Sequence, residues 1–150
     1  MIYSMPITDV ADAERFERIG VIADARAATQ TRRAFASWLG HFFDLDAARF
    51  NDLVLAVYEA LANSAEFAYV GTYGTGTMDI QARYDPAKFK LVVIVSDHGT
   101  WRSTQSPRAL SRGRGLPLIA ALSDHASIDT TDEGTRVHME WSDVGLRAAS

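Results

Sequence analysis

The 150-residue chain contains no cysteine and only two lysines, Lys88 and Lys90. Without cysteine, the chain forms no disulfide bond, and it has no thiolate that could act as a nucleophile or bind a metal. No apolar run approaches the ~20 residues with which a helix crosses a bilayer. The first residues also lack the basic and apolar regions of a signal peptide. The sequence therefore predicts a cytoplasmic protein that does not enter a membrane.

The chain also has no excess of basic residues. Its formal net charge is -4 and its pI is about 5.5, whereas general nucleic-acid-binding proteins present a basic face. Direct binding to nucleic acid is therefore not predicted. The hydrophobic fraction of 47% and the charged fraction of 23% are globular values. We predict a single domain over residues 1–150, in which the polar segments 1–17 and 143–150 are peripheral.

Hydrophobic periodicity predicts helices and strands that are grouped separately along the chain. Asp44 or Asp46 is expected to cap the second helix. The run Leu91–Val95 is uniformly apolar, which is typical of a strand buried on both faces. This grouping favours an α+β two-layer sandwich with a largely antiparallel sheet. The expected order is a strand at 18–24, a helix at 27–43, a helix from the cap to about 69, neighbouring strands at 77–84 and 88–97, a loop at 100–112, a helix at 115–124 and two strands within 127–141.

The second predicted helix carries two polar residues one turn apart, Glu59 and Asn63, although asparagine is unfavourable in a helix interior. A carboxylate and an amide oxygen so placed can supply a general base and a ligand for a hard cation such as Mg²⁺. The alternative is an ordinary solvated helix face. The predicted apolar stripe comprises Phe50, Leu53, Val54, Val57, Leu61, Ala65 and Ala68, and the opposite face comprises Asp52, Ala56, Glu59, Asn63 and Glu66.

A basic segment stands out in this acidic chain. Between Thr100 and Ser123 there is no acidic residue, and the segment contains Arg102, Arg108, Arg112 and Arg114. Gly113 and Gly115 come directly before a predicted helix, whose unpaired N–H groups and dipole favour an anion. Arg112 and Arg114 can add contacts to phosphate. A solvated basic loop with a glycine hinge is the alternative.

Asp97 lies where a buried strand is predicted to end, two residues before Gly99. A carboxylate in this position can accept a hydrogen bond from an exocyclic amine, and Gly99 would allow a flat ring to lie against the main chain. The alternative is a simple Asp-x-Gly turn.

Four segments in this order, "EALAN" (59–63), "DHG" (97–99), "RGRGLPLIAALSD" (112–124) and "GTRVHMEW" (134–141), resemble the GHKL superfamily of ATP-binding domains, which has the Bergerat fold. The chain is most similar to the RsbW-like anti-sigma factors that are also serine-protein kinases. The resemblance implies that Glu59 is the general base and that Asn63 is the Mg²⁺ ligand. It implies that Asp97, with Gly99 beside it, recognises the adenine amine.

The same resemblance implies that Gly113 and Gly115 lie under the phosphates and that Thr135 supports the adenine. The implied function is ATP-dependent: the protein would sequester a sigma factor and phosphorylate an antagonist of the STAS type on serine, and it would form a homodimer. Two positions depart from the family pattern, Phe67 in place of a histidine and Trp101 in place of a glycine. They leave an alternative open: a partner-binding module that is switched by nucleotide, or has lost it, and does not catalyse.

Overall fold

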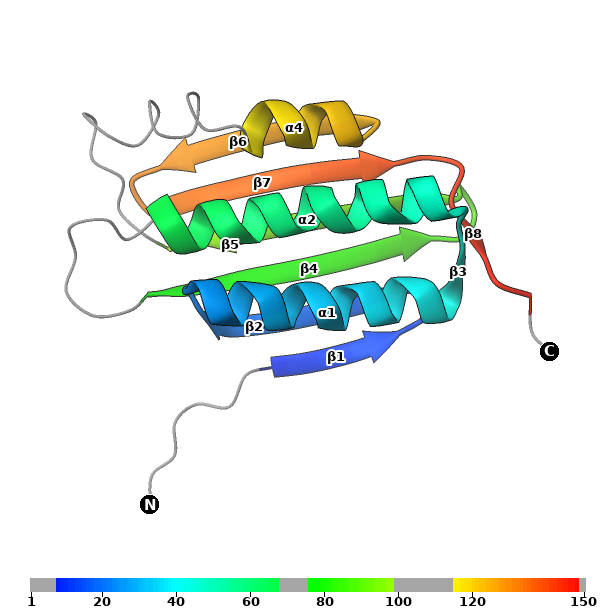
Figure 1. The fold of residues 1–150 in the computed structure, drawn as a ribbon, viewed down its shortest axis with the longest axis horizontal. Helices are drawn as coiled ribbons and strands as arrows, with labels where there is room; N and C mark the ends of the chain where they lie inside the picture. The colour runs from blue at the N-terminus through cyan, green and yellow to red at the C-terminus, as the bar shows by residue number, and fades with distance from the viewer. Residues whose placement is uncertain (1–7, 68–75, 99–114, 149–150) are drawn as a thin grey trace, which may run out of the picture.

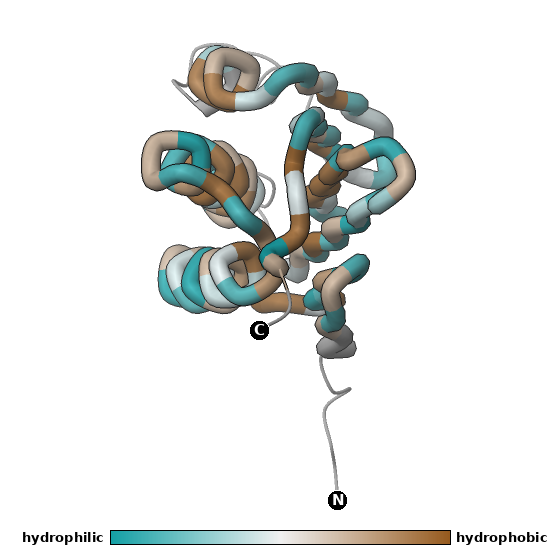
Figure 2. Tube along the Cα trace, turned by 90° about the vertical axis from the view of Figure 1, so that its right-hand side faces the viewer, coloured by the Kyte–Doolittle hydropathy of each residue, from teal (hydrophilic) through white to brown (hydrophobic). Residues whose placement is uncertain are grey.

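The computed structural model describes residues 8–67, 76–98 and 115–148. It contains a six-stranded sheet in the order β1-β2-β4-β5-β7-β6, in which every neighbouring pair is antiparallel. The described helices all lie against one face of this sheet (Figures 1 and 2). The predicted α+β two-layer sandwich is therefore confirmed. The elements are β1 (Thr8–Asp12), β2 (Arg15–Ile22), α1 (Ala25–Phe42), β3 (Phe43–Asp44), α2 (Ala47–Phe67), β4 (Thr77–Asp85), β5 (Lys90–Asp97), α4 (Gly115–Leu122), β6 (His125–Thr131), β7 (Gly134–Trp141) and β8 (Gly145–Leu146).

Aspartate caps begin the two long helices. The side chain of Asp24 accepts a hydrogen bond from the N–H of Ala27 at 2.7 Å, and that of Asp46 accepts one from the N–H of Arg49 at 2.8 Å. Each cap satisfies an N–H group that the first turn of a helix leaves unpaired. The predicted cap at Asp46 is thus confirmed. Among the helices that the structure describes, none has the length and apolar character needed to cross a membrane.

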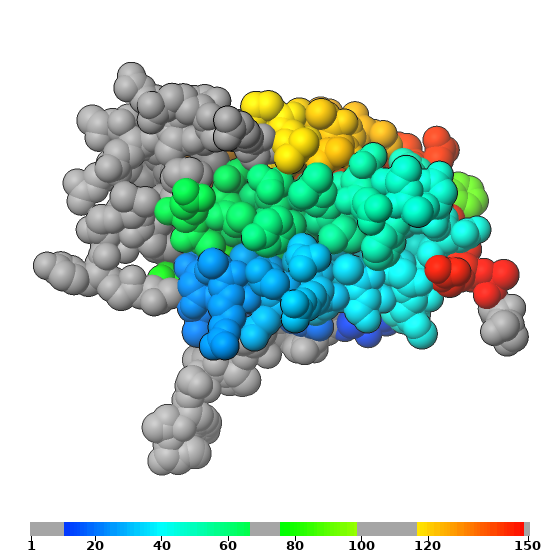
Figure 3. Space-filling view, viewed as in Figure 1, coloured from blue at the N-terminus to red at the C-terminus, as the bar shows by residue number. Residues whose placement is uncertain are grey.

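Helix α2 lies between α1 and α4 and forms with them the outer surface of the helical layer (Figures 1 and 3). Its buried surface is wider than the predicted stripe, because it contacts both helices as well as β5. Ala56, expected on the opposite face, is fully buried, as is Ala60. The assignment of Ala56 to a solvated face was therefore wrong. A helix that packs between two helices and against a sheet needs a broader apolar surface than a helix that contacts a sheet alone.

Within the described residues, the helices cover one face of the sheet that contains β5 (Figure 2). Leu91, Val93 and Val95 are fully buried, whereas Val92 and Ile94 on the other face are half-buried. The prediction that this strand is buried on both faces was wrong in that respect. Its predicted pairing with the preceding strand is confirmed by the antiparallel register of β4 and β5.

The first part of the chain also differs from expectation. Residues 8–17, read as peripheral, form β1 and the start of β2 at the edge of the sheet. Phe16 is fully buried, with its ring centroid 5.7 Å from that of Phe35 and 5.5 Å from that of Trp38. The supposed C-terminal tail contributes the buried Val144 and the short strand β8. Single aromatic or aliphatic residues in polar segments therefore complete the core.

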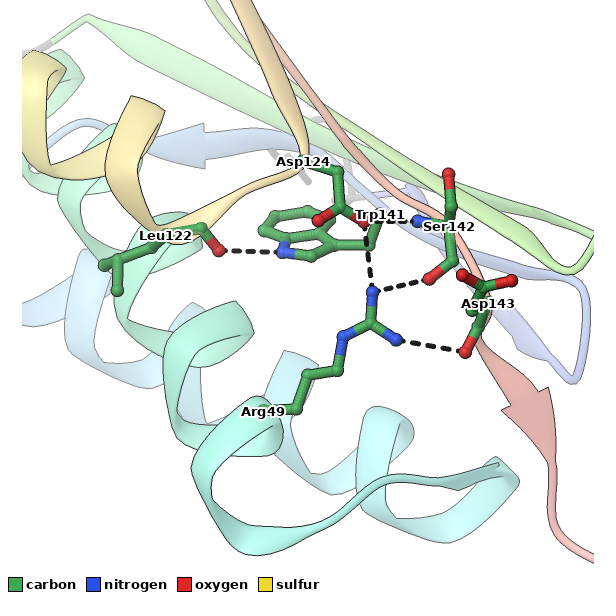
Figure 4. Close-up of polar contacts among 6 residues, drawn as sticks. All are labelled: Arg49, Leu122, Asp124, Trp141, Ser142 and Asp143. Carbon is green, nitrogen blue, oxygen red and sulfur yellow. Dashed lines mark hydrogen bonds and ion pairs between the residues drawn. The ribbon is translucent and has the colours of Figure 1, made fainter.

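A polar cluster joins the end of α4 to the start of α2 (Figure 4). The guanidinium of Arg49 donates to the carbonyl oxygens of Ser142 and Asp143 and pairs with Asp124 at 3.1 Å. The indole N–H of Trp141 donates to the carbonyl of Leu122 at 2.9 Å. These contacts hold the C-terminal end of α4 against the end of β7 and the first turn of α2.

Candidate functional site

The described part of the site is centred on Asp97, the last residue of β5. Its side chain is buried, with 4% of the residue exposed. The Oδ2 atom accepts a hydrogen bond from the hydroxyl of Ser64 on α2 at 3.3 Å, and Oδ1 accepts one from the N–H of Thr135 on β7 at 3.2 Å. Two elements, α2 and β7, therefore each donate a hydrogen bond to one buried carboxylate. The fold brings together Asp97 and Thr135, two of the predicted site residues.

The hydroxyl of Thr135 is the second feature of this site. The residue is 4% exposed, and its Oγ1 atom has no hydrogen-bond partner among the described residues. A buried hydroxyl without a partner is unfavourable, and such groups are rare in folded proteins. An unpaired hydroxyl beside a carboxylate offers a donor and acceptors to a ligand that carries both kinds of group. The Watson–Crick edge of adenine carries an amino donor and a ring-nitrogen acceptor, so these residues fit a purine base of this kind.

Gly134 allows the start of β7 to approach the end of β5. Its φ is +142°, a conformation that favours glycine, and a Cβ atom there would lie 2.0 Å from the carbonyl oxygen of Asp97. Any side chain would therefore push Thr135 and Asp97 apart. From the sequence, Gly134 is only the end of a hairpin turn, because its contact with Asp97 is visible only in three dimensions.

A cavity of about 510 Å³ opens where β5, β6 and β7 meet. Asp97 and Thr135 line it together with charged residues that include Asp129 and Arg136. His98, also in the lining, places Nε2 3.0 Å from Oδ2 of Asp79, and Oδ1 of Asp79 accepts the N–H of Gly20 at 2.9 Å. His98, which directly follows Asp97, is thereby linked through Asp79 to strands β4 and β2.

The other predicted residues divide into two groups. Glu59 and Asn63 lie one turn apart on α2 and are both half-buried. Asn63 directly precedes Ser64, so it belongs to the turn of α2 that contacts Asp97. Gly115 is the first residue of α4. Gly99, Arg112, Gly113 and Arg114 lie outside the described residues, as does Trp101, and their roles stay predictions.

Ser64 is a residue of the site that the sequence reading missed. It is 4% exposed and lies one turn after the buried Ala60 and Leu61. A serine among buried positions of an amphipathic helix needs a polar partner, because an unpaired buried hydroxyl is costly. That placement was a usable signal, but only after the buried face of α2 had been defined correctly.

The sequence profile of the histidine kinase-like ATPase domain matches residues 21–141. The chain belongs to this family. The match confirms the resemblance to GHKL ATP-binding domains and the Bergerat type of fold, and membership of an ATPase family implies that the domain binds ATP. A comparison with curated protein sequences found no match.

Two solved structures show the same fold. One contains the RsbU and RsbW domains of Rv1364c from Mycobacterium tuberculosis; it is 22% identical, has a TM-score of 0.65 and aligns over 90% of this chain and 33% of that chain. The other is the histidine kinase domain of a blue-light-activated kinase from Erythrobacter litoralis; it is 15% identical, has a TM-score of 0.52 and aligns over 78% of this chain and 59% of that chain. This chain thus spans about one third of the first of these two chains and about three fifths of the second.

Proposed function

We propose that this chain is an ATP-binding anti-sigma factor with serine/threonine-protein kinase activity. It would sequester a sigma factor in the cytoplasm and phosphorylate a STAS-type antagonist on serine. The observation that carries the nucleotide-binding part is the buried carboxylate of Asp97, which accepts hydrogen bonds from Ser64 and Thr135 beside a hydroxyl that has no partner in the part of the chain that the structure describes. The choice of an anti-sigma kinase is supported by the similar fold of a structure that includes an RsbW domain.

The residues that would hold the nucleotide come from four parts of the chain. Asp97 and Thr135 would bind the base, with Gly99 beside it, and Asn63 would supply an oxygen ligand to Mg²⁺. Unpaired N–H groups at the start of α4, near Gly115, would bind the phosphates. Gly113, Arg112 and Arg114 belong to the same proposed phosphate site. ATP, when bound, supplies the phosphoryl group.

Glu59 is the proposed catalytic residue. Its carboxylate would orient the hydroxyl of the antagonist's serine and accept the proton from the serine oxygen. Because phosphoryl transfer depends mainly on positioning and on stabilisation of charge, a carboxylate carried by a well-packed helix suits this role. Basic groups at Arg112 and Arg114 would offset the negative charge of the transferred group.

Incubation of the protein with labelled ATP and each STAS-type protein encoded beside its gene tests this proposal. The wild type should phosphorylate one of them on serine. Glu59→Ala should keep nucleotide binding and lose transfer, whereas Asn63→Ala should lose magnesium-dependent binding. Glu66→Ala, which removes an exposed carboxylate from the same helix, is the matched control and should change neither nucleotide binding nor phosphoryl transfer.

Two outcomes would contradict the proposal at different points. Undiminished affinity of the Asn63 variant for magnesium-ATP would remove that residue from the metal site. Nucleotide binding without phosphorylation of a partner that forms a stable complex would instead identify a non-catalytic module that is switched by nucleotide. Size-exclusion chromatography with light scattering tests the predicted homodimer separately.

A further inference from the structure

Ser64 on α2 donates a direct hydrogen bond to the buried carboxylate of Asp97. Serine in a helix commonly bonds to the carbonyl oxygen one turn before it. Here the hydroxyl of Ser64 in the helical layer donates a hydrogen bond to Oδ2 of Asp97 in the sheet, at 3.3 Å, and both residues are 4% exposed. The hydroxyl therefore connects the helical layer to the sheet inside the site.

The carboxylate of Asp97 also accepts a second hydrogen bond, and the two bonds together determine its orientation. Oδ1 of Asp97 accepts the main-chain N–H of Thr135, whose position depends on the strand and not on a side-chain rotamer. Oδ2 is held by a side chain instead. Together the two donors restrain the rotation of the carboxylate plane, so its lone pairs have a fixed direction before a ligand enters. A ligand then loses less freedom on binding, because the acceptor is already oriented.

We propose that Ser64 is a positioning residue that sets the base preference of the nucleotide site by orienting Asp97 toward a purine amino group. This inference rests on the proposed function, because it requires that Asp97 contacts a base. An oriented carboxylate accepts from an amino group and gains nothing from a purine that lacks one. Loss of the Ser64 hydroxyl leaves the carboxylate present but less oriented, so it reduces the preference for the amino group and does not abolish binding.

Isothermal titration calorimetry with ADP and with purine riboside 5′-diphosphate, which lacks the 6-amino group, measures this preference directly. The wild type should bind ADP about 10- to 100-fold more tightly, the scale of a hydrogen bond to a charged group. In Ser64→Ala this ratio should fall about three- to tenfold, through weaker ADP binding at nearly constant affinity for the analogue. Ser64→Thr, which keeps the hydroxyl, should restore the ratio.

Ser123→Ala is the matched control, because it removes a hydroxyl that donates to the carbonyl of Ile119 on α4 and has no contact with Asp97 in the described residues. It should leave the ratio unchanged. If Ser64→Ala does not fold, Ser64→Cys, which fills the same space with a weaker donor, provides the same measurement.

The possible failures are distinguishable. Equal weakening of both ligands in Ser64→Ala, or no change in either, would overturn the role of Ser64 and leave the nucleotide site in place. Absence of binding of both ligands by the folded wild type would overturn the proposed function, and the role of Ser64 with it.

Discussion

The hydroxyl of Thr135 has no hydrogen-bond partner among the described residues, and its removal is predicted to raise stability but to weaken nucleotide binding. Thr135→Val replaces the hydroxyl with a methyl group of similar size and keeps the β-branched shape that suits a strand. The main-chain N–H of residue 135, which donates to Asp97, is unaffected. The substitution therefore removes one atom's hydrogen-bonding capacity and little else.

The expected magnitudes follow from the burial of that atom. A buried polar group without a partner costs about 1–3 kcal/mol, and Oγ1 of Thr135 has no partner among the described residues. We expect the free energy of unfolding of the ligand-free protein to rise by about 1 kcal/mol, measured by urea denaturation. The affinity for ADP should fall about tenfold, because the base loses one hydrogen bond inside the site.

Thr131→Val is the control for the same change at a hydroxyl that has partners. Its Oγ1 accepts the N–H of Glu133 at 3.1 Å and donates to the carbonyl of Gly134 at 3.3 Å. This variant should lose about 0.5–1 kcal/mol of stability. If Thr135→Val loses as much stability as the control, or binds ADP as tightly as the wild type, the assignment of the Thr135 hydroxyl to a ligand is wrong.

Two further predictions concern the frame of the site and its pH dependence. Gly134→Ala should lower the free energy of unfolding, measured by urea denaturation, by about 3 kcal/mol or more, because its Cβ would lie 2.0 Å from the carbonyl oxygen of Asp97. Gly145→Ala is the control: a Cβ there would meet nothing within 4 Å, so stability should change by less than about 0.5 kcal/mol. Similar losses in both variants would show that the close approach of Gly134 to Asp97 does not matter. The hydrogen bond from His138 holds the pKa of Glu140 below its usual 4.5, so this carboxylate stabilises the fold above that pH and its contribution is lost as the pH falls through the lowered pKa. Urea midpoints between pH 7 and pH 3 should therefore depend less on pH in Glu140→Gln, and an unchanged profile would contradict the assignment.

Much of the sheet could be predicted from the sequence, because its central strands have clear patterns. Met78, Ile80, Ala82 and Tyr84 alternate with polar residues, and all four are buried in β4. The edge of the sheet could not be predicted in the same way. Strand β1 and the start of β2 are mostly polar, and the buried Phe16 packs there against Phe35 and Trp38 of α1. One aromatic residue gives no period, so no local pattern marks residues 8–17 as strands, whereas the apolar run in the later part of β2 lies within the strand expected at 18–24.

The site shows the same division. Asp97 could be proposed from its place at the end of an apolar run, and the structure finds it buried there. Ser64 and Gly134 lie against Asp97, through contacts that join α2 to β5 and β7 to β5. Such contacts depend on the packing of distant segments, and a serine or a glycine has many uses in a sequence. The contacts of Ser64 and Gly134 with Asp97 therefore could not be predicted from the sequence and are visible only in the folded structure.

The most direct test of the nucleotide site is the binding of ADP, with Mg²⁺ present, to the wild type and to Asp97→Asn, measured by calorimetry on folded protein. Asparagine keeps the shape of the side chain and replaces one acceptor oxygen with a donor. We predict that the wild type binds ADP and that the variant binds it at least about tenfold more weakly. No binding by the wild type, or equal affinity in the two proteins, would contradict a nucleotide site built on Asp97.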